Sequence, residues 1–145
     1  MLIRPMREED WESVLPMVQT MYQSSAVEHP VSTEIMHRAF SDAIGDNPHI
    51  VGYLMEEGGN LAGFVYLTFF YSCETGGNVV MIEELFIKES FRGQGIGQKF
   101  FDWLYQTYPD AKRYRLDMTH GNPAGHLYER NGFRYLNYDL LICDR

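Results

Sequence analysis

Apolar and polar positions follow two different periods along the chain, and the changes of period mark the predicted elements. Leu2 to Met6 is typical of a short strand. Across Trp11 to Tyr22, apolar residues recur at helical spacing just after a run of acids that suits a helix start, so we expect an amphipathic helix. Pro16 lies inside this pattern and indicates a kink or a later start. A second helix is expected within Ser32 to Gly45, because this segment begins with residues that suit a helix cap and ends with a glycine.

The middle of the chain has the composition and pattern of strands. His49 to Glu56, Leu61 to Tyr71 and Val79 to Ile87 are rich in β-branched and aromatic residues. Glycine-containing turns separate them, at Glu57 to Asn60 and at Glu74 to Asn78. Three strands joined by turns this short are expected to form an antiparallel meander.

Helical spacing returns after the meander. The glycine-rich segment Ser90 to Gly97 leads into a helix that ends at Pro109. Tyr114 to Met118 alternates like a strand, and a short helix is expected within Asn122 to Gly132, where proline suits the first turn and glycine the end. Phe133 to Cys143 fits a closing hairpin. The order of elements predicts an α/β (α+β) fold.

Composition and charge narrow the class of protein. A chain of 145 residues with 45% apolar residues suits one domain covering residues 1–145. The net charge of −8 disfavours nucleic acid and anionic membranes and attracts small cations, although solubility alone also explains it. Cys73 and Cys143 indicate free thiols in a reducing compartment. With no signal sequence or membrane-spanning run in the chain, we expect a cytoplasmic protein, and no spacing predicts a metal site.

The most informative segment is Arg92-Gly93-Gln94-Gly95-Ile96-Gly97, between a predicted strand and a predicted helix. A helix start carries unsatisfied N–H groups and a partial positive charge, and glycines let a ligand approach the backbone. This context favours a phosphate group. The spacing fits neither a dinucleotide fingerprint nor a Walker loop. A tight turn with a glycine cap is the alternative, but the cation before the amides favours a pyrophosphate.

Two segments together resemble the signatures of the GNAT N-acetyltransferase superfamily. Ile82 to Ile87 followed by Arg92 to Gly97 is similar to the family's central motif, a strand and then [Q/R]-x-x-G-x-[G/A]. Asn122 to Phe133 resembles the second signature, N-x-x-A-x-x-x-Y-x-x-x-G-F. The resemblance extends along nearly the whole chain. It implies a mixed, mostly antiparallel twisted sheet of six to seven strands, splayed between the fourth and fifth and flanked by about four helices.

The resemblance also implies an activity and a cofactor site. The activity is transfer of an acetyl group from acetyl-coenzyme A (acetyl-CoA) to a primary amine by direct attack. The pyrophosphate would lie on the amides of the glycine loop, and the pantetheine arm beside the strand, where one N–H faces the acetyl oxygen. The implied cofactor-binding residues are Leu85, Phe86, Ile87, Arg92, Gly93, Gln94, Gly95, Ile96, Gly97, Asn122, Ala124 and Tyr128.

Three side chains are candidates for acid–base chemistry. An alkylamine has a pKa of about 10 and must lose a proton before it attacks, whereas the leaving thiolate benefits from one. Tyr128 matches the family's general acid, although helix packing also explains it. Glu83 and Glu84 are candidates for the base or for amine anchors, or are solvated edge charges. Alternation turns them to opposite faces of the strand unless a bulge intervenes. Asn122 suits an N-cap as well as a cofactor contact.

The acceptor is less constrained than the cofactor. The strand Ile82 to Ile87 looks similar to diamine and polyamine acetyltransferases, and the acidic balance suits a small cationic amine or polyamine. Dimers are common in the resembling family, so a homodimer is an expectation. The alternatives are a peptide or protein N-acetyltransferase, a non-catalytic acyl-CoA-binding or regulatory module, and a nucleotide-phosphate binder.

Overall fold

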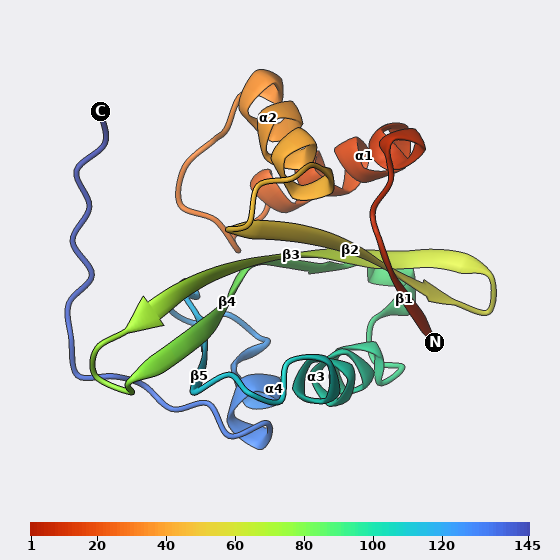
Figure 1. Ribbon diagram of the computed structural model, residues 1–145. Coiled ribbons are helices and arrows are strands. Elements are labelled where there is room, and N and C mark those ends of the chain that lie inside the picture. The colour runs from red at the N-terminus through yellow and green to blue at the C-terminus, as the bar shows by residue number, and fades with distance from the viewer.

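A five-stranded sheet lies between two pairs of helices in the computed structural model, which describes residues 1–145 (Figure 1). The strands are β1 (Leu2–Pro5), β2 (Ile50–Glu57), β3 (Asn60–Ser72), β4 (Gly77–Ile87) and β5 (Arg113–Leu116). The helices are α1 (Trp11–Tyr22), α2 (Thr33–Ile44), α3 (Ile96–Thr107) and α4 (Gly125–Arg130), with short 3-10 helices at Glu8–Asp10 and Glu89–Phe91. Helices α1 and α2 cover one face of the sheet, and α3 and α4 cover the other.

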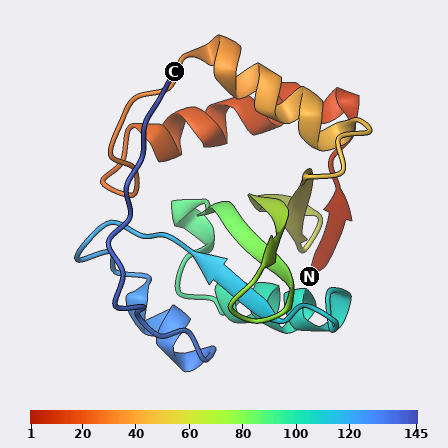
Figure 2. The same ribbon diagram turned by 60° about the vertical axis from the view of Figure 1, so that its left-hand side comes forward.

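The sheet follows the chain in the order β1-β2-β3-β4-β5. The first four strands are antiparallel neighbours, which confirms the predicted meander, and β5 runs parallel to β4. This parallel pairing covers only Val79 to Ile82 of β4 and ends at Leu116 of β5. Beyond Ile82 the edge of β4 has no neighbour, so the sheet is split between its fourth and fifth strands, as the resemblance implies (Figure 2).

Two apolar clusters, one on each face, hold the helices to the sheet. Phe64 and Tyr66 of β3 pack towards α1 and α2, whereas Val65 and Leu67 pack towards α3. All four are almost fully buried, because a central strand covered on both faces needs apolar residues at every position. The long apolar run of β3 therefore reflects two cores rather than one. No helix of the protein is both long enough and apolar enough to span a bilayer.

The predicted helices all form, with small shifts at their ends. Helix α1 begins at Trp11 and continues through Pro16, so the proline does not delay its start. Helix α4 begins at Gly125, later than the predicted Asn122. Asn122 instead closes a turn in front of the helix, because its Oδ1 accepts a hydrogen bond from the Ala124 N–H at 2.9 Å.

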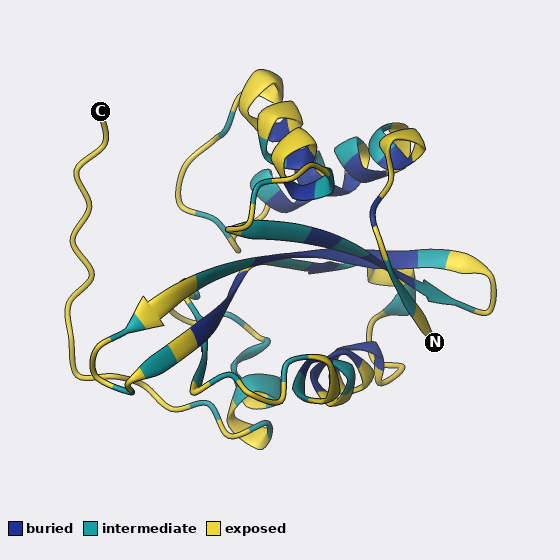
Figure 3. Cartoon of the chain, viewed as in Figure 1, coloured by how far each residue is buried: buried dark blue, intermediate teal, exposed yellow.

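The predicted closing hairpin from Phe133 to Cys143 does not form, and the sheet has five strands rather than six to seven. Residues 134–145 are all exposed and contain no strand (Figure 3). In Figures 1 and 2 this tail leads away from the sheet towards the C-terminus. An alternating sequence favours a strand, but a strand also requires a partner for its main-chain hydrogen bonds, and this tail has none within its own chain.

Candidate active site

The glycine loop leaves a run of main-chain N–H groups without partners. Gly93 and Gly95 have φ values of +72° and +79°, and α3 begins directly after them. The Arg92 N–H bonds the oxygen of Glu89, and the Lys99 N–H bonds that of Gly95, but none of the six N–H groups from residue 93 to 98 donates a hydrogen bond within the protein. These groups lie at the positive end of the α3 dipole. The loop therefore fits the pyrophosphate of a coenzyme A molecule through its main chain.

Glycine suits the positions of the loop for different structural reasons. A Cβ added at Gly93 or Gly95 would meet no atom within 4 Å, so these two serve backbone conformation and access. A Cβ at Gly97 would come within 2.5 Å of the Leu127 side chain. Gly97, which the resemblance places among the cofactor-binding residues, thus also allows α4 to pack closely against the first turn of α3.

Arg92 ties the loop to the end of β4. Its Nε donates a hydrogen bond to the Ile87 oxygen at 3.0 Å, and its guanidinium lies 5.9 Å from the centre of the Phe86 ring. Gln94 folds back in the same loop, with its Nε2 donating to the Ser90 oxygen at 2.9 Å. The cation is therefore held beside the free amides, where it complements an anionic ligand.

The main chain of β4 faces the split. The Lys88 N–H donates to the Ala62 oxygen of β3 at 2.8 Å. Since N–H groups of an antiparallel strand alternate in direction, Leu85 and Ile87 turn theirs to the opposite edge, which β5 leaves open. Their side chains pack against the α3-side cluster. The two predicted donors for an acetyl oxygen thus lie at the opening of the sheet.

A bulge in β4 turns both glutamates to the same face. The register against β3 shifts at Glu83: Tyr66 pairs with Glu84, and the next residue of β3 pairs with Ile82. Glu83 accepts a hydrogen bond from the Thr68 hydroxyl at 2.9 Å, and Thr68 shares its face of β3 with Tyr66. The extra residue therefore cancels the alternation that would separate the two carboxylates, and both point to the side of α1 and α2.

The two carboxylates have different surroundings. Glu83 is exposed, whereas Glu84 is half-buried and accepts a hydrogen bond from the Tyr22 hydroxyl. The second oxygen of Glu84 is buried without a partner, as is the Tyr66 hydroxyl. Burial raises the pKa of Glu84 although the Tyr22 hydrogen bond opposes the rise. Both unpaired groups border a small cavity of about 30 Å³, lined by Val18, Tyr22, Val31, Ile35, Met36, Ala39, Tyr66 and Glu84.

Tyr128 combines core packing with a free hydroxyl. Its ring centre lies 6.0 Å from that of Phe101 and 6.1 Å from that of Phe133, so the packing interpretation holds. Burial raises the pKa of Tyr128, and its hydroxyl forms no hydrogen bond within the protein. Two reciprocal hydrogen bonds between the amides of Gln98 and Asn131, at 2.9 and 3.1 Å, fix α4 against the start of α3. The hydroxyl is thus rigidly placed and available to a ligand.

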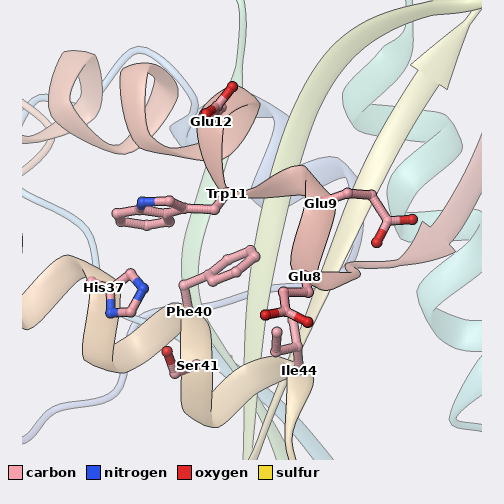
Figure 4. Close-up of a pocket in the computed structure, with 8 residues that line it drawn as sticks. All are labelled: Glu8, Glu9, Trp11, Glu12, His37, Phe40, Ser41 and Ile44. Atoms are coloured by element: carbon pink, nitrogen blue, oxygen red, sulfur yellow. The ribbon is translucent and has the colours of Figure 1, made fainter.

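A larger hollow lies elsewhere. The short 3-10 helix before α1 and the first turn of α1 form one side of it, and α2 forms the other (Figure 4). It has a volume of about 410 Å³ and is lined by Glu8, Glu9, Trp11, Glu12, His37, Phe40, Ser41 and Ile44. None of these residues belongs to the glycine loop, to β4 or to α4. This hollow therefore lies apart from the predicted site, where the unsatisfied polar groups are found.

Sequence reasoning missed the tyrosines that surround Glu84. Tyr22 lies 62 residues away from Glu84 in the chain and follows the apolar stripe of α1, so it looked like a core residue. Tyr66 stands inside the continuous apolar run of β3. The sequence feature that could have indicated these tyrosines was the pair of adjacent acids in a central strand, because a buried carboxylate requires polar neighbours.

The split sheet, the helix start with free amides and the acid pair are the features expected of an acyl-CoA-dependent transferase, and comparison with known proteins identifies the family. Residues 11–133 match the model of the Acetyltransferase (GNAT) family. The chain belongs to this family and is an acetyltransferase, a class of enzymes that uses acetyl-CoA.

Individual relatives agree with this assignment. A thialysine N-epsilon-acetyltransferase from Sus scrofa is 28% identical over 93% of this chain and 85% of its own length. The protein of the same name from Mus musculus is 30% identical over 67% of this chain and 61% of its own. A predicted acetyltransferase from Clostridium acetobutylicum, crystallised with acetyl-CoA, has the same fold, with a TM-score of 0.76, 17% identity and coverage of 98% of this chain and 95% of its own.

Proposed function

We propose that the protein transfers an acetyl group from acetyl-CoA to the primary amine of a small cationic molecule by direct attack of that amine. The observation that carries the proposal is the split between β4 and β5. Glu83 and Glu84 lie on the α1–α2 face, whereas Tyr128 and the glycine loop belong to the α3 side. The split connects the two faces, so an amine from one side can reach a thioester held from the other.

Main-chain groups would bind the cofactor. The N–H groups of residues 93–98 would hold the pyrophosphate, supported by Arg92. When bound, acetyl-CoA supplies a thioester carbonyl that an amine can attack. The N–H of Leu85 or Ile87, at the open edge of β4, would donate to the carbonyl oxygen and stabilise its growing negative charge. This local set of donors explains how a chain of net charge −8 can bind an anionic cofactor.

The two glutamates would have different roles towards the amine, one as an anchor and the other as a base. Glu83 is exposed at the bulge, where its carboxylate would attract an incoming ammonium group. Glu84 has a free oxygen and a raised pKa, which brings it closer to the pKa that suits a general base at neutral pH. Glu84 would therefore receive the amine proton, and Tyr22 would hold its other oxygen in place.

Tyr128 would assist the departure of the thiolate. Its raised pKa keeps the phenol protonated, so its hydroxyl can donate to the sulfur as negative charge develops there. The contacts of its ring with Phe101 and Phe133 restrict the direction of that hydroxyl. Asn122 and Ala124 contribute by ending the turn that starts α4.

The acceptor class rests on two observations. The acid pair and the net charge favour a cation. Two relatives named for N-epsilon-acetylation of thialysine support an amine acceptor. We therefore propose a diamine, a polyamine or a lysine-like amine rather than a peptide N-terminus.

A thiol-release assay with acetyl-CoA tests the proposal. The panel contains short diamines, polyamines, thialysine, an aminoglycoside and a peptide with a free N-terminus. We expect turnover with the first three and a KM for them well below that for the peptide. Turnover with the peptide alone would contradict the acceptor class. Calorimetric binding of acetyl-CoA without thiol release by any amine would instead favour the non-catalytic module.

A further inference from the structure

One hydrogen bond joins two loops that belong to opposite faces of the sheet. The Thr119 hydroxyl, in the loop of residues 117–124 that leads into α4, donates to the Ser25 oxygen at 2.9 Å. Ser25 lies in the loop of residues 23–32 between α1 and α2, and no other hydrogen bond connects the two loops. Figure 2 shows both loops on the same side of the molecule. We call this contact the Thr119–Ser25 bridge.

Each end of the Thr119–Ser25 bridge is held by the helix beside it. The main-chain N–H and the hydroxyl of Ser24 both donate to the Met21 oxygen, at 3.1 and 2.6 Å, which fixes the chain at the end of α1. The Thr119 oxygen accepts a hydrogen bond from the Asn122 N–H at 3.2 Å, in the turn before α4. The bridge therefore connects two ordered points rather than two free loops.

Both ends of the bridge lead back to the acid pair by short paths. Ser25 comes three positions after Tyr22, whose hydroxyl donates to Glu84. Thr119 comes three positions after Leu116, the last residue of β5 that pairs with β4. Three residues of chain span about 10 Å at most, so the bridge lies close to the acid pair from both sides.

These contacts close a ring at the end of the split nearest the acid pair. It consists of the end of α1, the bridge, the end of β5 and the bulge of β4, that is, Tyr22 to Ser25, Leu116 to Thr119 and Ile82 to Glu84. Peptide bonds, one strand pairing and two hydrogen bonds complete it. Of these links, the bridge is the one that joins the loops of the two faces directly, so its presence limits how far these loops can separate.

We infer that this ring frames the path by which the amine reaches the split, and that Thr119 is a specificity-determining residue. The inference rests on the proposed function. A ring with arms this short admits an unbranched amine more readily than a wide one. Ser25 is exposed and Thr119 partly exposed, so loss of the bridge widens the path without disturbing the core or any proposed catalytic group.

Two diamines of equal charge and different width test the role of Thr119. One is linear, and the other carries a cyclohexane ring between its two aminomethyl groups. Thr119→Val keeps the size of the side chain but removes the donor, so kcat/KM for the ring diamine should rise about fivefold, the effect of one lost hydrogen bond. The value for the linear diamine should change by less than about twofold. Thr119→Ala removes the same donor and should act in the same direction, whereas Thr119→Ser keeps the hydroxyl and should behave like the wild type.

Thr107→Val is the matched control, because Thr107 is exposed at the end of α3 and its hydroxyl forms no hydrogen bond. It should leave the ratio of the two kcat/KM values unchanged, and thermal unfolding shows that each variant is folded. The inference is overturned if Thr119→Val changes both diamines by the same factor or neither, or if Thr119→Ser or Thr107→Val shifts the ratio equally. In these cases the wild type still acetylates the linear diamine, so the proposed function stands. A wild type that acetylates no amine would overturn both.

Discussion

The glycine loop and the bulge of β4 both bring polar groups into a largely apolar structure. The loop does so with main-chain groups and the bulge with side chains. The loop presents main-chain N–H groups, which every residue carries, so its function depends on conformation at Gly93 and Gly95. The bulge presents the side chains of Glu83 and Glu84, which depend on register and on distant partners such as Tyr22. The proposed binding of the cofactor thus rests on local conformation, whereas the proposed roles of the two glutamates depend on the tertiary structure.

The largest expected effect is on the chemical step, which follows binding of the cofactor and of the amine. Tyr128→Phe removes only the hydroxyl and keeps the ring packing, so kcat should fall about a hundredfold. The dissociation constant for acetyl-CoA, measured by calorimetry, should stay within about twofold of the wild type, since the loop is untouched. A variant with normal kcat would remove Tyr128 from the reaction and leave it as a packing residue.

Substitutions at the bulge should separate the two glutamates. Glu84→Gln should lower kcat by about thirtyfold, because the proposed base is lost. Glu83→Gln is the matched control at the neighbouring position and should mainly raise the KM for the amine. Equal effects of the two substitutions on kcat would contradict the assignment of one as base and the other as anchor.

The pH profile should report the surroundings of Glu84. Burial raises its pKa, so the reactive carboxylate is lost at a higher pH than for an ordinary glutamate. In the pH profile of kcat/KM, the acid limb should therefore fall above the usual glutamate range of about 4.3. Tyr22→Phe removes the hydrogen bond that opposes this rise and should move the limb further up. A limb that shifts down in this variant would show that another group titrates.

At the loop, backbone strain has to be separated from cofactor access. Gly95→Val should weaken acetyl-CoA binding about tenfold, because a side chain replaces open space beside the free amides. Gly59→Val is the matched control: Gly59 has a φ of +80° against +79° at Gly95, and a Cβ at either site meets no atom within 4 Å. Both variants should lose similar thermal stability, but only the first should lose affinity. Equal affinities would count against the loop.

The smallest effect on activity is expected at Asp10, outside both regions. Asp10 is buried and accepts two hydrogen bonds from Arg4, at 2.8 and 2.9 Å, which lower its pKa. A lowered folded-state pKa stabilises the fold above the unfolded value of about 3.9, and this contribution disappears as the pH falls below it. Asp10→Asn should cost about 2 kcal/mol of unfolding free energy at pH 7. Urea titrations at pH 7 and pH 3 should show the difference between variant and wild type shrinking at the lower pH.

The same contrast explains what the sequence could predict. The glycine loop was predictable because the two glycines between the strand and the helix, Gly93 and Gly95, determine the local conformation themselves. The bulge was left open, because an extra residue in β4 becomes visible only against the register of β3. The closing hairpin was wrong for a related reason. Alternation in residues 136–142 defines the two faces of a strand but does not name the edge with which it pairs.

The central claim is that main-chain N–H groups of residues 93–98 bind the cofactor and that the thioester reaches the open edge of β4. Amide chemical shifts, followed by nuclear magnetic resonance during titration with acetyl-CoA, test this claim at the atoms concerned. We expect the largest changes at residues 93–98, together with changes at Leu85 or Ile87. Unchanged loop amides, with the main changes at the hollow around Trp11 and His37, would contradict it.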